Sequence, residues 1–337
     1  MRRLLLDSGA FSVWNRGATI DLDAYIQFCI DHPTVSYFVN LDVIPGKPGD
    51  VKSLTKDAIE GAAQAGWDNY QKMLKRLPIE KVVPVFHQND GFHWLEKYLD
   101  FGTPYIGISP ANDRSTSQRL VWMEQVKKWV VNSAGQSIVK MHGFAVTSFR
   151  LMKFWQWESV DSASWLRVAA NGSIYVPYLL KGECDYSRSP FLLSVSPKSP
   201  NRADRGAHIL SCSPLIKQQM TKYLDDIGMG LGEWVVEPVE TGHKLDDHEL
   251  WWDKTKTQVL RTTKKGVATC HQRRFWANVV FLKKANEVLP VEHIYFAGSG
   301  QHPKVEQEID RRLLSYYDIA SGNAVKKTFD FHLEQLG

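Results

Sequence analysis

Short runs of β-branched and other apolar residues alternate, in the first half of the chain, with longer segments whose apolar residues recur three and four positions apart. Such alternation is typical of βαβ units that build a parallel sheet. Runs such as 82–86 are almost continuously apolar, which indicates strands covered on both faces. The pattern predicts strands at 4–7, 36–42, 81–87, 105–109, 138–142 and 159–161, and helices at 22–30, 56–77, 92–99, 118–131 and 148–155.

Six expected strands before residue 162 favour a TIM-like (β/α)8 barrel over a three-layer sandwich. No strand can precede the first one, so the missing strands must come from the C-terminal half, and the barrel is then permuted. Segments 208–213 and 293–298 are the best candidates, each followed by a helical pattern, at 214–226 and 303–317. The expected domains are the main part of the catalytic barrel (1–180), a basic irregular insertion (181–270), and C-terminal helices and a strand that complete the barrel (271–337).

The composition is that of a globular protein, with 43% hydrophobic and 23% charged residues among 337. The cysteines Cys29, Cys184, Cys212 and Cys270 are widely spaced, which suits reduced thiols better than disulfides or a zinc knuckle. No apolar stretch is long enough to cross a bilayer, and the start of the chain reaches an acidic turn too early for a signal peptide. We therefore expect a soluble, cytoplasmic protein with no membrane partner.

Basic residues are concentrated in one segment, although the net charge is only +4. Between residues 254 and 284 there are nine Lys or Arg and no Asp or Glu. A segment of this kind suits a phosphate backbone, although a basic run is often only a solvated face. The candidate nucleic-acid contacts are Lys264, Lys265, Arg273 and Arg274, with Arg202 and Arg205 in the preceding Ser/Pro-rich loop.

Polar residues stand at the C-terminal ends of the expected strands, the face that carries the active site in barrels. Asp7 and Asp161 are two carboxylates from the ends of different strands. One could attack a sugar carbon while the other handles protons on a base, as a base-exchanging glycosidase requires. The full set is Asp7, Asp42, His87 with Gln88, Ser109, His142 and Asp161.

The same strand ends could hold a purine such as guanine, whose edge presents a carbonyl, a ring N–H and an exocyclic amine. A pocket for that edge needs a carboxylate for the two donors and an N–H for the carbonyl. Asp42, Gln88 and the backbone of Gly107 could supply these groups, and Phe11 and His142 could cover the two faces of the ring. Each residue also has an ordinary structural interpretation, such as a helix cap or a buried histidine.

Several segments between about residues 4 and 176 resemble motifs of the queuine/archaeosine tRNA-guanine transglycosylases, in the order in which that family has them. The chain is most similar to their phage relatives that insert 7-deazaguanines into DNA. The matching segments are Asp7-Ser8-Gly9-Ala10-Phe11, Asn40-Leu41-Asp42, Phe86-His87-Gln88, Ile106-Gly107-Ile108-Ser109-Pro110, Met141-His142-Gly143-Phe144 and Val160-Asp161-Ser162-Ala163-Ser164-Trp165.

The resemblance implies a role for each matched position. Asp161 would be the nucleophile and Asp7 the acid/base. The residues that bind the base would be Ser8, Phe11, Asp42, Gln88, Gly107, His142 and Gly143. Segment 270–275 is similar to a His-containing helix near the C-terminus of the family.

Two departures from the family bear on the substrate. The Cys-x-Cys-x-x-Cys and later His of the zinc-binding tRNA enzymes are missing, so we expect no metal and no cofactor, and no RNA-binding appendage is recognisable. The sequence thus predicts a DNA-guanine transglycosylase, a pentosyltransferase that exchanges guanine in DNA for free 7-cyano- or 7-aminomethyl-7-deazaguanine through a covalent aspartyl–glycosyl intermediate. If the protein is phage-encoded, it acts in the cytoplasm of a bacterial host. The alternatives are a tRNA-guanine transglycosylase without zinc, a glycosylase that releases the base to water, and a DNA-binding barrel without catalysis.

Overall fold

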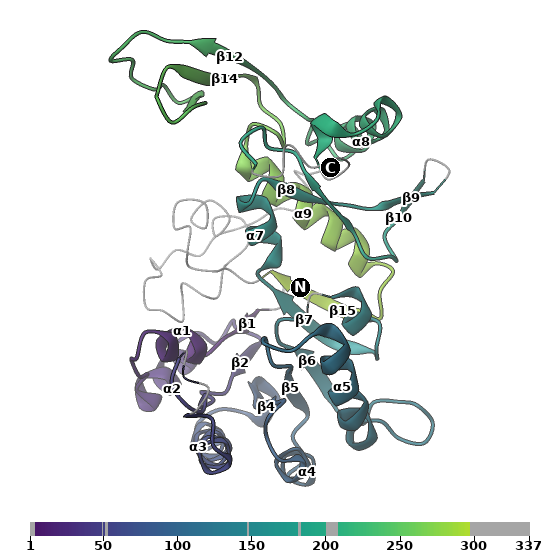
Figure 1. Cartoon of the computed structure of the whole chain (residues 1–337). Coiled ribbons are helices and arrows are strands. Elements are labelled where there is room, and N and C mark those ends of the chain that lie inside the picture. Colours follow the sequence, from purple (N-terminus) through teal and green to yellow (C-terminus); the bar gives the residue numbers. More distant parts are fainter. Residues whose placement is uncertain are drawn as a thin grey trace. The chain divides into compact units, whose positions relative to one another are not determined.

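The computed structural model describes residues 4–48, 50, 53–146, 148–180, 183–199 and 208–296 (Figure 1). These residues form two compact units, each a mixture of helices and strands. The first unit runs to Ser162 and includes the segment that begins at Pro290, and the second is Ala163–Leu289. The expected domain boundaries near 180 and 270 therefore both lie within the second unit.

Parallel strands form the centre of the first unit, as the alternating pattern predicts. One sheet has the order β1-β2-β3 and the other has the order β15-β7-β6-β5-β4, with all neighbours parallel. Pro84 separates β3 from β4 because it has no N–H for the ladder, yet its carbonyl still accepts the Gly107 N–H at 2.7 Å. The strands are β1 (Leu5–Leu6), β2 (Tyr37–Val39), β3 (Val82–Val83), β4 (Val85–His87), β5 (Tyr105–Ser109), β6 (Lys140–Gly143), β7 (Trp157–Ser162) and β15 (Val291–Phe296).

One expected strand is wrong. Residues Ile209–Ser211 form a 3-10 turn, and His208 makes only an isolated bridge with Ser194. The turn is stabilised locally, because the Leu210 N–H donates to His208 Nδ1 and the Ser211 N–H to the His208 carbonyl. The other C-terminal candidate is confirmed as β15, although residues 297 and 298 lie outside the described part of the chain.

The helices of the first unit begin where the sequence offers capping side chains. Asp21, Thr55 and Ser115 each accept a backbone N–H of the first turn, and Ser115 forms a capping box with Gln118. The expected helices are found, although the one at 148–155 is reduced to Phe149–Met152, and a short helix, α1, is added. The expected helix at 303–317 lies outside the described residues. The helices are α1 (Ala10–Asn15), α2 (Leu22–Asp31), α3 (Lys56–Leu74), α4 (Phe92–Asp100), α5 (Thr116–Val130) and α6 (Phe149–Met152).

A buried cluster lies on one side of the parallel strands. Strands β1 to β5 supply Leu5, Val39, Val83, Val85 and Tyr105, and the partly buried Tyr37, Phe144 and Tyr295 pack against them. The two strands at the ends of the sheet orders, β1 and β15, thus contribute to the same cluster. Complete burial of such a side chain stabilises the fold by about 1.5–3 kcal/mol. The cluster fixes the strand ends on which the polar residues stand.

Helix α9 organises the second unit. Its fully buried Asn278 donates to the Trp165 carbonyl at 2.9 Å and accepts the Tyr175 N–H at 2.7 Å, which joins α9 to α7 and β8. The elements of this unit are α7 (Ser164–Ala170), β8 (Ser173–Val176), β9 (Tyr178–Leu180), β10 (Glu183–Asp185), β11 (Phe191–Ser194), α8 (Pro214–Asp226), β12 (Glu233–Pro238), β13 (Glu249–Trp251), β14 (Gln258–Lys264) and α9 (His271–Asn286).

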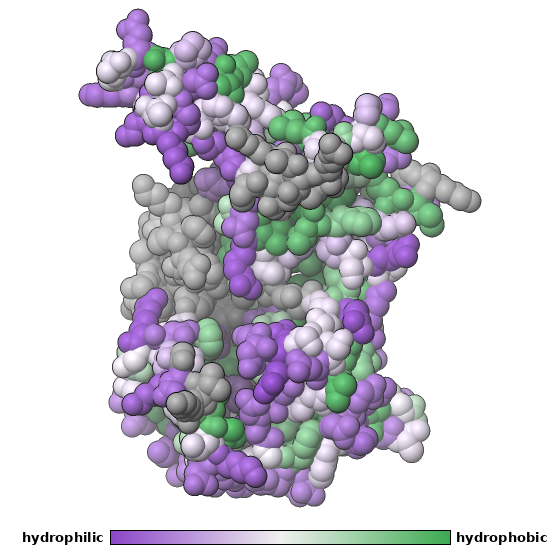
Figure 2. Space-filling model, in the orientation of Figure 1, coloured by the Kyte–Doolittle hydropathy of each residue, from purple (hydrophilic) through white to green (hydrophobic). Residues whose placement is uncertain are grey.

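The antiparallel sheet β12-β14-β13 is thinly covered. Val235 and Val236 are 38% and 39% exposed, and Leu250 is 53% exposed. Figure 2 shows hydrophilic side chains over much of the visible surface of β12 and β14, with a few hydrophobic ones between them. Within the described ranges, no helix of either unit combines the length and apolar character needed to span a bilayer.

Candidate active site

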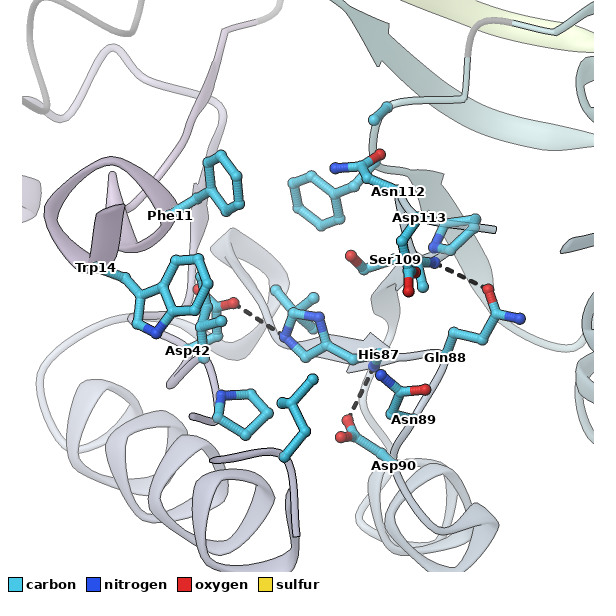
Figure 3. A pocket seen from close by; sticks show the side chains of 18 of the residues that line it. Phe11, Trp14, Asp42, His87, Gln88, Asn89, Asp90, Ser109, Asn112 and Asp113 are labelled. Carbon is cyan, nitrogen blue, oxygen red and sulfur yellow. Dashed lines mark hydrogen bonds and ion pairs between the residues drawn. The ribbon is translucent and has the colours of Figure 1, made fainter. Parts of the chain in front are cut away.

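A pocket of about 470 Å³ opens at the C-terminal ends of the strands of the first unit (Figure 3). The side chains at these ends point into it because successive residues of a strand face opposite sides, and the last inward residue meets the opening. Six of the seven strand-end residues singled out by the sequence line it: Asp7, Asp42, His87, Gln88, Ser109 and Asp161.

Asp7 has the most informative electrostatics in this pocket. Burial, followed by the charges of Asp42 and Asp161, raises the pKa of Asp7 from 3.8 to about 7, against the lowering effect of backbone N–H groups at Ser8 and Gly9. A carboxyl with a pKa near neutrality can both give and take a proton, as general acid/base catalysis requires. The influence of both other carboxylates also means that the three acidic groups share one electrostatic environment.

Asp161 is held by the backbone of the turn that follows β6. Its Oδ1 accepts the Ala145 N–H at 2.6 Å, and Asp161 is only 8% exposed. Ala145 has a φ of 52°, which is uncommon for a residue with a side chain. Unusual backbone of this kind is concentrated at functional sites. The position of the expected nucleophile is thus fixed by a strained turn.

His142 lies beneath Asp161 and does not line the pocket among the described residues. It is fully buried, its Nδ1 is 2.6 Å from Ser159 Oγ, and its Nε2 is 3.8 Å from Asp161 Oδ1. Burial lowers the pKa of His142 to about 3, so its ring is neutral. The expectation that His142 stacks on a base is therefore corrected. Its ring is enclosed within the protein, where it contacts Ser159 and Asp161.

The aromatic wall of the pocket comes from other residues. Phe11, on α1, is 55% exposed and lines the pocket, as do Trp14 and Phe144. Phe144 follows directly after Gly143, a position where an added Cβ would lie 2.8 Å from Val146 and 3.0 Å from Trp157. Gly143 thus permits close packing of β6. Phe144, rather than the expected His142, is the ring from this segment that lines the pocket.

Two residues expected to bind a base carbonyl are engaged within the protein. The Gln88 Oε1 accepts the Ala111 N–H at 2.9 Å, so this side chain holds the loop after β5. The Gly107 N–H donates to the Pro84 carbonyl within the sheet. A Cβ at Gly107 would lie 2.3 Å from the Phe144 ring, so the glycine makes room for that ring. The Gly107 N–H is therefore occupied within the sheet, whereas Gln88 lines the pocket and its Oε1 contact leaves the Nε2 donors that a base carbonyl would need.

Asp42 and Ser8 meet as expected for members of one site, and they are joined by His87, a strand-end residue to which the sequence assigned no role in binding the base. The buried Ser8 Oγ donates to Asp42 Oδ1 at 3.3 Å, and His87 Nε2 lies 3.0 Å from Asp42 Oδ2. The alternation of side chains along β4 could have shown that His87 faces the pocket. Val85 belongs to the inner cluster and Phe86 packs outward on Phe92 and Trp122, so His87 must face inward again.

The expected nucleic-acid contacts lie in the second unit, and one of them is wrong. Arg274 is 8% exposed, and its guanidinium donates to the carbonyls of Ala169 at 2.8 Å and Val267 at 2.9 Å. Burial lowers the pKa of Arg274 to about 10. Arg273 likewise donates to the Met229 carbonyl at 2.8 Å. These arginines brace α9, because helix ends and turns leave carbonyls that need donors.

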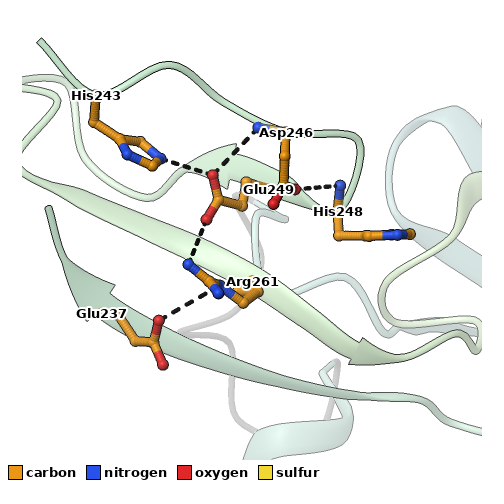
Figure 4. Close-up of polar contacts among 6 residues, drawn as sticks. All are labelled: Glu237, His243, Asp246, His248, Glu249 and Arg261. Atoms are coloured by element: carbon orange, nitrogen blue, oxygen red, sulfur yellow. Dashed lines mark hydrogen bonds and ion pairs between the residues drawn. The ribbon is translucent and has the colours of Figure 1, made fainter.

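Acidic residues from neighbouring strands accompany the rest of the basic segment. Lys264 Nζ lies 3.7 Å from Glu233 Oε1, and Arg261 contacts Glu237 at 3.5 Å and Glu249 at 2.8 Å (Figure 4). Lys265 is exposed, and Arg202 and Arg205 lie outside the described residues. The acid-free stretch in the sequence therefore does not form an acid-free surface, because strand pairing brings β12 and β13 beside β14.

No group of three or more His, Cys, Asp or Glu side chains in the described ranges is arranged to hold a metal ion. Comparisons of the chain with protein-family models, with curated proteins and with solved structures find no match. The pocket is therefore the feature of the molecule that bears on its function.

Proposed function

We propose that this protein is a transglycosylase that replaces guanine in DNA by a 7-deazaguanine, such as the 7-cyano or 7-aminomethyl form. The observation that carries the proposal is the one pocket that Asp7, Asp42 and Asp161 line together, where burial and the two other carboxylates raise the pKa of Asp7 to about 7. Three carboxyl groups in one partly apolar pocket suit a reaction that needs a nucleophile, a proton carrier and a reader of N–H groups.

The finer fold belongs to the same proposal. We infer that the parallel strands of the first unit curve into a TIM-like barrel, with β15 as a strand contributed by the C-terminal part of the chain. Support comes from the buried cluster, to which both β1 and β15 contribute although they stand at opposite ends of the strand order. In such barrels the site lies at the C-terminal ends of the strands.

In the proposed reaction, Asp161 attacks C1′ of the target nucleotide while the bond from C1′ to guanine breaks. Protonated Asp7 gives its proton to the departing base, and the sugar becomes an ester of Asp161. The ionised Asp7 then accepts the N9 proton of the incoming 7-deazaguanine, whose nitrogen displaces Asp161 from C1′. Two inversions retain the configuration, and Asp7 ends protonated as it began.

The target guanine must leave the base stack before Asp161 can reach its sugar, at a cost of a few kcal/mol. Phe11, Trp14 and Phe144 give the pocket the aromatic surface that would cover an extruded base. The proposed partners are thus DNA and the free deazaguanine base, with exposed Lys265 as a candidate phosphate contact. The reaction would take place in the cytoplasm, where the DNA is found.

The test is incubation of the full chain with single-stranded or duplex DNA and a 7-deazaguanine, followed by digestion to nucleosides and mass analysis. We expect a modified deoxynucleoside from the wild type and at least about 1000-fold less from Asp161→Asn, because loss of a nucleophile removes the covalent route. Asp68→Asn, an exposed carboxylate on α3, is the matched control and should keep full activity.

Other products would decide for other functions. Incorporation into tRNA but not into DNA would identify a tRNA-guanine transglycosylase. Guanine release without any added base would identify a glycosylase. Equal exchange by wild type and Asp161→Asn would refute the assigned nucleophile.

A further inference from the structure

We propose that His87 reads position 6 of the bound base, and that together with Asp42 it makes the pocket selective for 6-oxo over 6-amino purines. This inference rests on the proposed function, since it concerns the base that the same pocket would hold. It assigns to His87 the carbonyl contact that the sequence assigned to Gln88 and Gly107.

The position of His87 is fixed at both its backbone and its ring. It is the last residue of β4, its N–H donates to Asp90 Oδ2 at 2.9 Å, and its carbonyl accepts the Asp90 N–H at 3.0 Å. Figure 3 shows the imidazole between Asp42 and Ser109, inside the pocket. The side chain is 25% exposed, so the ring is accessible to a ligand in the pocket.

The two ring nitrogens have different tasks. Nε2 lies 3.0 Å from Asp42 Oδ2, and since a carboxylate only accepts, attraction between these two atoms requires a proton on Nε2. Among the described residues, Nδ1 makes no hydrogen bond. A neutral ring would offer Nδ1 as an acceptor, whereas the imidazolium offers it as a donor. The protonation state of His87 therefore decides which group the pocket can recognise.

The surrounding charges favour the imidazolium. Burial alone would lower the pKa of His87, but the contact with Asp42 and the charges of Asp42 and Asp90 raise it above its ordinary value of 6.5. The other charged or titratable groups that line the pocket are Asp7, Lys47, Asp50, Asp113 and Asp161. Most of them are acidic, so the charges around the pocket favour the positive form of the ring.

The resulting pair of groups complements a guanine-type edge. The Asp42 carboxylate, whose oxygens have lone pairs beyond those used by Ser8 and His87, can accept from the ring N–H and the amine. The His87 Nδ1–H can donate to the neighbouring carbonyl. A 6-amino purine would place a donor against this donor and leave both unsatisfied, which we expect to weaken binding roughly 100-fold.

The experiment measures equilibrium binding of 7-deazaguanine and 7-deazaadenine to the full chain between pH 6 and 9. For the wild type we expect 7-deazaguanine to bind roughly 100-fold more tightly at pH 6, and this preference to decline as His87 loses its proton. His87→Gln supplies a neutral amide donor, so it should keep the preference without that decline. His87→Ala should lose the part of the preference that the carbonyl contact supplies and keep the part that comes from Asp42. Asp7 titrates in the same range, so the difference between wild type and His87→Gln isolates the contribution of His87.

The matched control is His93→Gln. His93 lies 3.1 Å from Glu60 through its Nε2, as His87 does with Asp42, but it is 56% exposed and does not line the pocket among the described residues. It should bind both bases as the wild type does. Circular dichroism establishes that each variant is folded.

The two proposals fail in different ways. If folded wild type neither binds nor exchanges a deazaguanine, the proposed function is wrong. If it does both and His87→Ala keeps the full preference and the same pH profile, only the assignment of His87 is wrong.

Discussion

Replacement of Asp7 by Asn should stabilise the protein at alkaline pH. The folded state holds the proton of this carboxyl up to about pH 7, whereas an unfolded chain releases it near pH 3.8. Native stability therefore falls as the pH rises through this window, and the full cost is present above pH 7. Asn has nearly the same shape and no charge, so it avoids this cost.

The size of the effect follows from the pKa. Each pKa unit corresponds to about 1.36 kcal/mol, so the rise from 3.8 to about 7 corresponds to about 4 kcal/mol at most. We expect Asp7→Asn to be more stable than the wild type by up to that amount at pH 8, and the difference to shrink towards zero near pH 4. Base exchange should be lost in the same variant, as is common where an active site is maintained at the expense of stability.

The assay must follow the first unit by itself, because two compact units need not unfold together. The stability of the first unit is measured by urea unfolding at pH 5 and pH 8, with brief proteolysis at each urea concentration. Mass analysis then identifies which fragments come from the first unit. Asp68→Asn is the control, and its stability should stay within about 0.5 kcal/mol of the wild type at both values. A gain of equal size at pH 5 and pH 8, or no gain at pH 8, would refute the assigned electrostatics of Asp7.

Two further predictions concern packing and the second unit. Gly107→Ala would place a Cβ 2.3 Å from the Phe144 ring, so we expect about 1–3 kcal/mol of destabilisation and weaker base binding, measured by urea unfolding and base titration; Gly61→Ala, with open space around it, should show neither. Glu249→Gln should loosen the sheet β12-β14-β13 at pH 7, because the contact with His243 lowers the pKa of Glu249 below 4.5. That stabilisation is present above pH 4.5 and is lost as the pH falls through the lower pKa of Glu249 in the folded state. Hydrogen exchange in β13 and β14 should therefore differ between Glu249→Gln and the wild type at pH 7 and become the same in acid.

Most of the first unit could be predicted from the sequence because its signals are local. Continuous apolar runs and helical periodicity identified the strands from β1 to β7 and placed the starts of α3 and α5 within two positions. The strand expected at 208–213 was wrong, since the apolar residues there belong to a short turn whose hydrogen bonds are made by His208. A run this short carries too little periodicity to distinguish the two.

The choice between His87 and Gln88 depended on register. Adjacent residues at a strand end face opposite directions, so register gives His87 and Gln88 different contacts although both line the pocket. The apolar neighbours Val85 and Phe86 contained that information. Gln88 was chosen instead because an amide can donate to the base carbonyl.

The sequence by itself determined the alternation of strands and helices and the presence of polar residues at the strand ends, because both follow from contacts along a few residues. Only the tertiary structure decided which of these groups share a pocket, that Asp7 has a pKa near 7, and that Arg274 is buried. Burial and charge interactions depend on segments far apart in the chain. Their strength varies with distance in space, which the order of residues does not specify.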